Sequence, residues 1–486
     1  MANRHLLVGL IAVIGCSSQP ATALSSRAAT ARNSRAAVTS LAESAAAAPR
    51  ALTDLGTRRA GSDWPRFLGP TGDGISTETG IVTPWPAAGL KVVWQRQVGT
   101  GYCVPSVSKG RLFLFDRHGD NARLSCWKSE TAEPLWQFDY PTHYEDRYGY
   151  NNGPRCCPVV DDDRVYIHGV EGMLHCLSAD DGKPRWRVDT FADFGVVPNF
   201  FGVGSTPVVE GDLLIVQVGG SPPTDKNAPF PEQTGNGSGV VAFDKWTGKI
   251  RYKITDELAS FSSPVLTTID GRRWCFVLAR GGLIGFEPST GKVDFHYDWR
   301  ARELESVNAA NPVVVGNRVL ITEAYGPGSS FLQVRPGAYD VLWNDADKGR
   351  RKSLQSHWTT PIHHNGYVYG DSSRHPENAD IRCVELATGK VMWREPDNGH
   401  TSLLMVDGHF VVLTEFGELI LIKVNPQKCE EISRFDLFRL VEGAPKERSR
   451  AAQREAPWWA APILSHGLLY VRSKNTLMCL ELIPTK

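Results

Sequence analysis

A set of polar and aromatic side chains occupies one kind of position, just before short apolar segments that mostly open with proline. Its members are Tyr102, Asn152, Arg155, Phe201, Glu305, Ser306, Asn308, His357, Trp358, His400, Trp458 and Trp459. If these positions converge, the set could hold a small polar ligand or a calcium ion. The opposing interpretation is that these side chains only hydrogen-bond neighbouring loops. The principal candidates for binding are Tyr102, Arg155, Glu305, Asn308, His357, Trp358 and Trp459.

Motifs that would assign a reaction are missing from the sequence. It has no Gly-x-Ser-x-Gly, no His-Glu-x-x-His, no glycine-rich phosphate loop followed by lysine, and no Cys-x-x-Cys-His. The neighbouring histidines His363 and His364 are more typical of a solvated strand-turn than of a metal site. We therefore assign no catalytic residue and no metal ligand from motifs.

Composition restricts the class of protein. The 486 residues carry a formal net charge of zero, with 41% hydrophobic and 22% charged residues, as in ordinary globular proteins. No basic excess suggests nucleic acid as a partner, and no acidic tract suggests a solvating tail. No apolar run reaches the roughly 18 residues that a membrane-spanning helix needs.

The elements that must position the candidate residues are repeats of about fifty residues. Each repeat has a proline-opened apolar strand, a second apolar strand, a third strand and a glycine turn followed by an aromatic strand. The turn glycine and the aromatic residue recur as Gly182 with Trp186, Gly248 with Tyr252, Gly291 with Phe295 and Gly389 with Trp393. Ala132 and Trp136 form a degenerate copy. Short strands at this period predict a β-propeller with four antiparallel strands in each blade.

Eight blades are predicted from the strand openings. They begin at Pro105, Pro158, Pro207, Pro264, Pro312, Pro361, Leu403 and Pro462. The last blade lacks an aromatic strand, and the segment 91–95 resembles an orphan fourth strand. Pairing this segment with the C-terminal strands would close the ring and remove both sheet edges. Seven blades is the alternative, because the repeats at 312–343 and 403–435 are weakly patterned.

The N-terminus predicts export. Arg4 and His5 precede a short apolar stretch, 6–14, that is typical of a signal peptide. The run Val13-Ile14-Gly15-Cys16 resembles a lipobox, which would make Cys16 the lipid-modified first residue of a mature protein, with residues 1–16 as the signal segment. Cleavage after 21–23, releasing a soluble protein, is the alternative. Residues 17–62 read as a flexible low-complexity tether, and residues 63–486 as the propeller.

One cysteine position recurs on the third strand of several blades. Cys126, Cys176, Cys383 and Cys479 occupy it, and Ala242 and Gly285 are the counterparts in other blades. A cysteine alternating with alanine and glycine favours a small buried side chain over a disulfide or a metal ligand.

The repeats resemble a known family. The segments 181–186 and 387–393 resemble the PQQ-type repeat, and 64–76 resembles the start of exported bacterial PQQ-like propellers, which are commonly compared with the outer-membrane assembly lipoprotein BamB. The resemblance covers residues 64–486. It implies a propeller at the periplasmic face of a membrane or elsewhere in the cell envelope, attached to the membrane only through its lipid anchor, with an envelope protein as partner.

The same repeat also occurs in quinoprotein dehydrogenases, which implies a second possibility. Those enzymes hold PQQ with Ca²⁺ in the central funnel, and they commonly carry a disulfide between adjacent cysteines. Cys156 and Cys157 are adjacent here. However, they fall where a blade begins, and other blades have Ser205-Thr206 or Thr359-Thr360 at that position. This favours the interpretation that the two cysteines are small structural side chains over a role beside a cofactor.

Three functions therefore remain in competition. The first, which we favour, is a protein-interaction scaffold of the cell envelope whose funnel binds a small ligand. The second is a PQQ-dependent oxidoreductase acting on an alcohol or a sugar. The third is a glycan-binding propeller that uses Trp358, Trp458 and Trp459 as stacking platforms.

Overall fold

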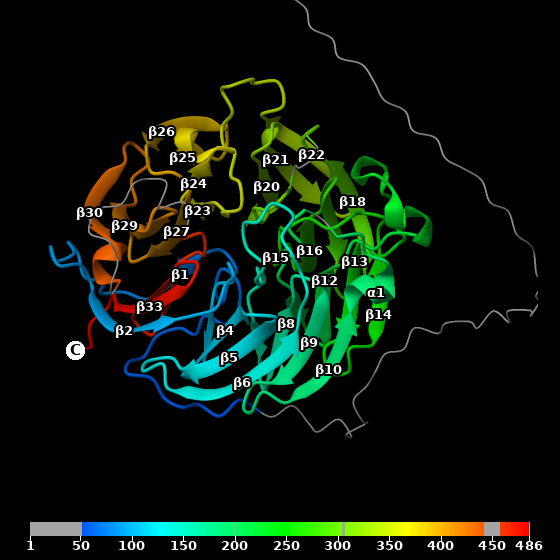
Figure 1. Cartoon of the computed structure of the whole chain (residues 1–486). Coiled ribbons are helices and arrows are strands. Elements are labelled where there is room, and N and C mark those ends of the chain that lie inside the picture. Colours follow the sequence, from blue (N-terminus) through cyan, green and yellow to red (C-terminus); the bar gives the residue numbers. More distant parts are fainter. Residues whose placement is uncertain (1–50, 199, 304–306, 442–456, 486) are drawn as a thin grey trace, which may run out of the picture. The chain divides into compact units, whose positions relative to one another are not determined.

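The computed structural model describes residues 51–198, 200–303, 307–441 and 457–485. These residues form eight four-stranded antiparallel sheets, one of which gains a fifth, parallel strand. The sheets are arranged as blades around a central axis (Figure 1). The prediction of eight blades is confirmed, and the alternative of seven is wrong, because both weakly patterned repeats form complete sheets.

The first four blades follow chain order. They are β3 (Ser106–Ser108), β4 (Arg111–His118), β5 (Asn121–Lys128) and β6 (Pro134–Pro141); β7 (Val159–Asp161), β8 (Arg164–His168), β9 (Met173–Ser178) and β10 (Pro184–Asp189); β11 (Val208–Glu210), β12 (Leu213–Gln217), β13 (Val240–Asp244) and β14 (Ile250–Ile254); and β15 (Val265–Ile269), β16 (Arg272–Leu278), β17 (Gly282–Glu287) and β18 (Lys292–Asp298). Helix α1 (Thr190–Phe194) follows β10, and the short helices η1 (Pro223–Asn227) and η2 (Phe230–Glu232) lie between β12 and β13.

The remaining blades complete the ring. They are β19 (Val313–Val315), β20 (Arg318–Glu323), β21 (Gly328–Arg335) and β22 (Ala338–Asn344); β23 (Ile362–His364), β24 (Tyr367–Ser372), β25 (Asp380–Glu385) and β26 (Lys390–Pro396); β27 (Thr401–Val406), β28 (His409–Thr414), β29 (Glu418–Lys423) and β30 (Glu430–Asp436); and β31 (Ile463–Ser465), β32 (Leu468–Arg472), β33 (Thr476–Glu481) and β2 (Lys91–Gln97). The short helices η3 (Pro376–Asn378) and η4 (Leu437–Leu440) follow β24 and β30. In every blade except the seventh, the first strand begins one residue after the predicted proline.

The N-terminal strand closes the ring as predicted. Strand β2 pairs antiparallel with β33, so that Val92 lies opposite Leu480 and Trp94 lies opposite Cys479. The last blade therefore takes its outer strand from the beginning of the chain. This pairing gives β33 a partner on both sides and leaves no open gap in the ring.

A contact between the outer strand of one blade and a turn of the next joins the blades. Trp186 of β10 donates from Nε1 to the carbonyl of Lys245 at 3.0 Å, in the turn between β13 and β14. Its ring lies on Gly248 of that turn, where an added Cβ would come within 2.8 Å of the indole. Gly248 has φ +72°, which glycine adopts without strain. Corresponding hydrogen bonds run from Trp94, Trp136, Tyr252, Trp343 and Trp393 to the carbonyls of Ser129, Ala179, Pro288, Leu386 and Asn425.

The recurrent cysteines are buried inside the blades. Cys126, Cys176, Cys383 and Cys479 lie on third strands and expose 0% of their surface. At the equivalent positions, Ala242 also exposes 0% and Gly285 is buried. Every described cysteine is a free thiol. Burial raises the pKa of Cys176 to about 11, which keeps the thiol protonated. These cysteines therefore fill the core, as the sequence predicts.

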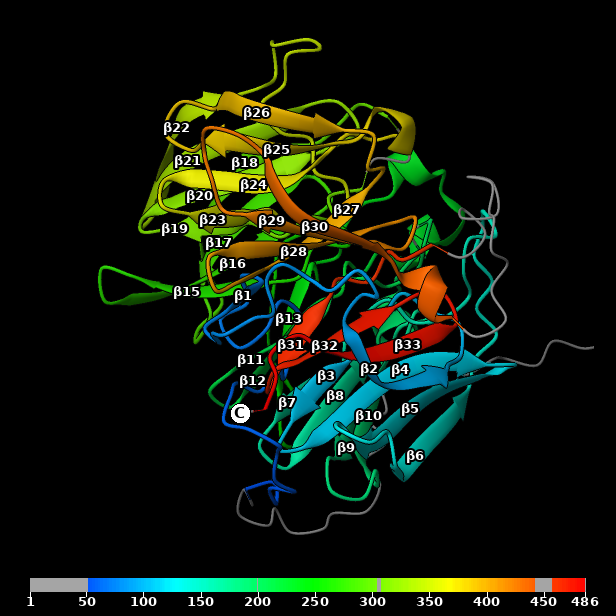
Figure 2. The ribbon, with the colours of Figure 1, turned by 90° about the vertical axis from the view of Figure 1, so that its left-hand side faces the viewer.

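The segment before β2 packs against one side of the ring. Trp64 forms an antiparallel bridge with Val107 of β3, and Pro65 accepts a hydrogen bond from Val160 of β7. Strand β1 (Ile75–Ser76) then pairs parallel with Met405 and its neighbour in β27. In the side view, β1 lies on the same side of the ring as the turn between β15 and β16 (Figure 2). Between these two anchors the chain crosses the central channel.

Part of the predicted tether also contacts the ring. Leu52 is buried, and the amide of Leu55 donates to the carbonyl of Lys109 at 3.1 Å. Arg58 pairs with Glu481 of β33 at 2.7 Å. Residues 1–50 lie outside the described residues, and no helix of the described part is long and apolar enough to cross a membrane.

The contact between blades should dominate stability. We expect Trp186→Ala to lower the free energy of unfolding by about 3–5 kcal/mol, because it empties a buried site between two blades. Trp186→Phe should cost only about 1 kcal/mol, since it keeps the ring and loses one hydrogen bond. Urea denaturation of both variants measures the difference. The matched control is Arg187→Ala, at the exposed neighbouring position, which should unfold like the unchanged protein.

Candidate functional site

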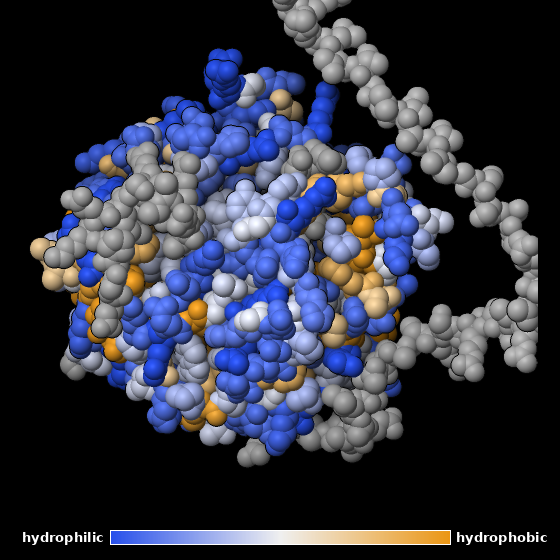
Figure 3. All heavy atoms as spheres, in the orientation of Figure 1, coloured by the Kyte–Doolittle hydropathy of each residue, from blue (hydrophilic) through white to orange (hydrophobic). Residues whose placement is uncertain are grey.

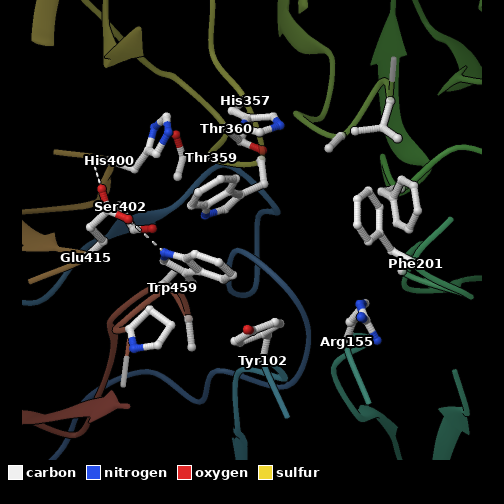
Figure 4. Close-up of a pocket in the computed structure, with 18 of the residues that line it drawn as sticks. Tyr102, Arg155, Phe201, His357, Thr359, Thr360, His400, Ser402, Glu415 and Trp459 are labelled. Carbon is white, nitrogen blue, oxygen red and sulfur yellow. Dashed lines mark hydrogen bonds between the residues drawn. The ribbon is translucent and has the colours of Figure 1, made fainter. Parts of the chain in front are cut away.

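The central channel widens into a cavity of about 750 Å³. It lies where the chain enters each inner strand, and residues from blades all around the ring contribute to its wall. Phe67 and Leu68 of the segment that crosses the channel also line it and form its floor. Figure 4 shows Trp459, His400 and Glu415 on one side of the cavity and Phe201 and Arg155 on the other.

Five of the seven principal candidates line this cavity. Tyr102 lies between β2 and β3, Arg155 between β6 and β7, His357 and Trp358 between β22 and β23, and Trp459 just before β31. Phe201 and His400, named with them from the sequence, also belong to the wall. The sequence pattern brings these residues together because the chain enters every inner strand at the same rim.

Three of the other candidates, Asn308, Trp458 and Asn152, do not line the cavity. Asn308 is buried, and its amide Nδ2 donates to the carbonyl of Ala279 at 2.7 Å and to that of Trp299 at 3.2 Å, so it fixes neighbouring loops. Trp458 exposes 1% of its surface and packs edge-on against Phe438, so it offers no stacking platform. Glu305 and Ser306 lie outside the described residues.

Aromatic rings form a continuous wall. Trp459 lies with its ring centroid 5.0 Å from that of Trp358, 4.8 Å from Tyr102 and 6.1 Å from Tyr150. Tyr150 lies 6.1 Å from Phe201. Such tilted contacts between rings stabilise one another and hold each ring in a fixed orientation. The cavity therefore presents a preformed aromatic surface to a ligand.

The guanidinium of Arg155 is neutralised by the protein. Its Nη2 lies 2.5 Å from Oδ2 of Asp146, whose side chain is fully buried. The same guanidinium donates to the carbonyls of Gly153 and Asn151. Arg155 also lies over the ring of Tyr102, with 6.0 Å between the guanidinium carbon and the ring centroid. Arg155 therefore stabilises the wall and does not present an unpaired positive charge.

A buried network holds the opposite side of the cavity. Nδ1 of His400 lies 2.9 Å from Oδ2 of Asp371, and the backbone amide of His400 donates to Glu415 at 2.9 Å. The other carboxylate oxygen of Glu415 accepts from Nε1 of Trp459 at 3.1 Å. Burial by itself would lower the pKa of His400, but the hydrogen bond and the charge of Asp371 outweigh burial, so this pKa is raised. Burial raises the pKa of Asp371, and its hydrogen bond with His400 opposes that shift.

His357 remains uncharged in the wall. Burial, followed by the charges of His400 and Arg374, lowers the pKa of His357 to about 3. Its Nε2 lies 3.1 Å from the hydroxyl of Tyr325. Its Nδ1 and the hydroxyl of Thr359, both buried atoms of cavity-lining residues, have no hydrogen-bond partner among the described residues. Buried polar atoms are normally paired, so this part of the wall can accept a hydrogen-bonding ligand or water.

Several wall residues were missed by the sequence analysis. Tyr325, Arg374, Glu415 and Lys474 all follow the second strand of a blade. In an antiparallel blade, the loop after the second strand lies at the same rim as the entry to the first. The loop after the second strand of each repeat is therefore the sequence signal that could have found them.

A family model described as outer membrane protein assembly factor BamB matches residues 142–395, slightly more than half of the chain. The chain belongs to this family. The match spans from the loop after β6 to the end of β26, and therefore covers five consecutive blades of the BamB-like propeller. No match is found among the curated protein sequences.

Solved structures share the fold at low sequence identity. BamB from Moraxella catarrhalis aligns with a TM-score of 0.53 and 15% identity, over 81% of this chain and 97% of that one. Quinohemoprotein alcohol dehydrogenase ADHIIG from Pseudomonas putida HK5 aligns with a TM-score of 0.59 and 12% identity, over 88% and 81%. The quinohemoprotein alcohol dehydrogenase from Comamonas testosteroni gives 0.56 and 11%, over 86% and 80%. At these identities the likeness shows the fold alone.

The described residues show no ready calcium site beside a bound PQQ, and Glu305, the candidate carboxylate, lies outside them. Calcium takes six to eight oxygen ligands. The carboxylate oxygens of Glu415 already accept hydrogen bonds, and the described residues contain no group of three or more His, Cys, Asp or Glu side chains that could hold a metal. Arg155, a natural partner for a carboxylated ligand, is paired with Asp146. Cys156 and Cys157 are buried free thiols that do not line the cavity.

The neutral state of His357 predicts a pH dependence. Its pKa near 3 in the folded protein lies below its ordinary value of about 6.5, so the unfolded chain binds this proton more readily. Acidification from pH 7 to pH 5 should therefore cost about 2 kcal/mol of stability at this residue. We expect His357→Gln to lose less stability than the unchanged protein over this range, as measured by urea denaturation at both pH values. His143→Gln, at an exposed histidine, should retain the full loss; equal losses in all three proteins would contradict the assignment.

Proposed function

We propose that this chain is a binding protein of the cell envelope that recognises a carbohydrate in its central cavity. The observation that carries the proposal is the combination of a preformed aromatic wall with charges that are mostly paired within the protein. The proposal combines the ligand-binding funnel of the favoured scaffold hypothesis with the glycan-binding alternative.

Charge favours a neutral ligand. Arg155 is paired with Asp146, Arg374 with Glu303, and His400 with Asp371. The cavity-lining Lys474 forms no ion pair among the described residues, but two carboxylates, Glu415 and Glu377, line the same cavity. An anionic ligand would have to compete with these internal carboxylates for its partners. A neutral ligand leaves the pairs intact.

Surface chemistry favours a sugar among neutral ligands. A pyranose has C–H faces that pack on aromatic rings and hydroxyl edges that both donate and accept hydrogen bonds. The rings of Trp358, Trp459 and Tyr102 supply such a surface. The unpaired His357 Nδ1 and the hydroxyl of Thr359 supply polar partners beside it. The volume of about 750 Å³ lies within the range of small-ligand sites.

A protein-interaction scaffold is the second candidate. Membership of the family described as an outer membrane protein assembly factor favours it, and so do apolar side chains exposed on outer strands of four blades. These are Leu135, Ile250, Val293 and Leu342, exposed by 37%, 48%, 38% and 44%. Their position on outer strands leaves the cavity free, so a scaffold role with an envelope protein partner is compatible with ligand binding.

Carbohydrate binding can be tested by substituting a single tryptophan of the cavity wall. We expect the protein to bind neutral oligosaccharides on a glycan array, and Trp459→Ala to weaken that binding at least tenfold, because it removes the ring at the centre of the wall. The control is Trp246→Ala, which removes a half-buried indole in the turn between β13 and β14. Absence of binding to every neutral oligosaccharide would contradict the proposal. Retention of quinone absorbance after incubation with PQQ and Ca²⁺ would favour the oxidoreductase.

In this proposal the membrane attachment runs through Cys16, which lies outside the described residues. We expect the unchanged protein to fractionate with membranes and Cys16→Ser to move to the soluble fraction, because the thiol is the site of lipid attachment in a lipobox. Membrane fractionation followed by immunoblotting measures this. Cys126→Ser, at a cysteine buried in a blade, is the control. A soluble unchanged protein would instead support cleavage after 21–23.

A further inference from the structure

The aromatic wall does not stop at the mouth of the cavity. Tyr150, which lines the cavity, lies 6.4 Å from Tyr148, and Tyr148 lies 5.6 Å from Phe201 and 6.0 Å from Phe200. Phe200 in turn lies 4.2 Å from Phe230 in η2. We call Tyr148, Tyr150, Phe200, Phe201 and Phe230 the rim track. It continues the wall outward from Trp459 to the insertion between β12 and β13.

The rim track is open to solvent at its centre. Tyr148 exposes 45% of its surface and Tyr150 exposes 52%. Isolated exposed aromatic residues are ordinary, but two neighbouring rings that continue a cavity wall form a single surface. The loop that carries them crosses in front of the centre of the ring (Figure 1), on a face that is otherwise mostly hydrophilic (Figure 3).

Arginine side chains hold the outer rings in place. The guanidinium of Arg147 lies 5.4 Å from the centroid of the Phe200 ring, and that of Arg280 lies 3.2 Å from the centroid of Phe230. These cation–π contacts fix the orientation of the two rings. The outer part of the track is therefore ordered before a ligand arrives, which lowers the entropic cost of binding.

The floor of the cavity determines where a longer ligand must go. Phe67 and Leu68 line the cavity on the side of the segment that crosses the channel. The amide of Gly74 donates to the carbonyl of Leu68 at 2.9 Å, so the crossing segment is a hydrogen-bonded loop. A ligand longer than the cavity must therefore extend through the mouth, where the rim track begins.

We propose that the cavity and the rim track together bind a linear neutral glycan of several sugar units. One end of the glycan occupies the cavity against Trp358 and Trp459, and the following units lie along Tyr150 and Tyr148. This inference rests on the proposed function, because it takes the carbohydrate class from the cavity. It adds that the ligand is a chain and that its length is recognised outside the cavity.

Affinity should therefore depend on chain length. Calorimetric titration of the full chain with linear glucose and N-acetylglucosamine oligomers of one to six units should give affinities that rise with length. We expect Tyr148→Ala to weaken binding of the six-unit oligomer about tenfold, because it removes one stacking ring, and to leave binding of the two-unit oligomer within twofold. Tyr148→Phe keeps the ring and should bind both oligomers like the unchanged protein.

Two controls separate this inference from the proposed function. Leu342→Ala removes a side chain of nearly the same exposure as Tyr148, 44% against 45%, on the outer strand β22, and should change neither affinity. Trp459→Ala should weaken the two-unit and six-unit oligomers alike. If oligomers bind with one affinity at all lengths and Tyr148→Ala has no effect, the inference is overturned and the carbohydrate site stands. If no oligomer binds, both are overturned.

Discussion

The structure depends on the contact between an outer-strand aromatic ring and the glycine turn of the next blade. Trp186 on Gly248 is the clearest example, since the indole both packs on the turn and donates to the carbonyl of Lys245. A side chain on that glycine would collide with the ring, so the turn and the aromatic residue constrain each other. Repetition of the contact around the ring fixes the spacing of the blades. The spacing of the blades in turn fixes where their inner loops meet.

The chemistry of the cavity follows from this arrangement of the blades and their loops. Loops from different blades place aromatic residues and mostly paired charges at the same rim, so much of the wall is held in a fixed arrangement. The pair of Arg155 with Asp146 and the network of His400 with Asp371 and Glu415 hold the wall without offering a free ion to a ligand. Recognition must then come from shape, ring stacking and neutral hydrogen bonds.

Much of the fold could be predicted because short sequence repeats determine the strands and turns of each blade. The prolines before inner strands, the glycine turns and the orphan segment around Trp94 each carry a local backbone or packing requirement, and the structure confirms eight blades closed by that segment. The site was predicted in part. Tyr102, Arg155 and Trp459 precede inner strands, so the repeat pattern identifies them. Glu415 lies in the loop between the second and third strands of its blade, where the repeat gave no such signal.

Other features could not be predicted because they depend on tertiary contacts. Asn308 has the position of a wall residue, but its amide satisfies two backbone carbonyls and turns away from the cavity. Phe67 belongs to a segment without repeat character, and only its route across the channel makes it part of the floor. Pairing of charges such as Arg155 with Asp146 likewise depends on loop geometry that composition does not reveal.

The closing blade has a consequence for synthesis. Strand β2 leaves the ribosome early, but its partner β33 begins only at Thr476, close to the end of the chain. Until β33 has been synthesised, β2 has no strand to pair with. An exposed strand of this kind can pair with the wrong chain. A product truncated before Thr476 would therefore lack the closing pair entirely.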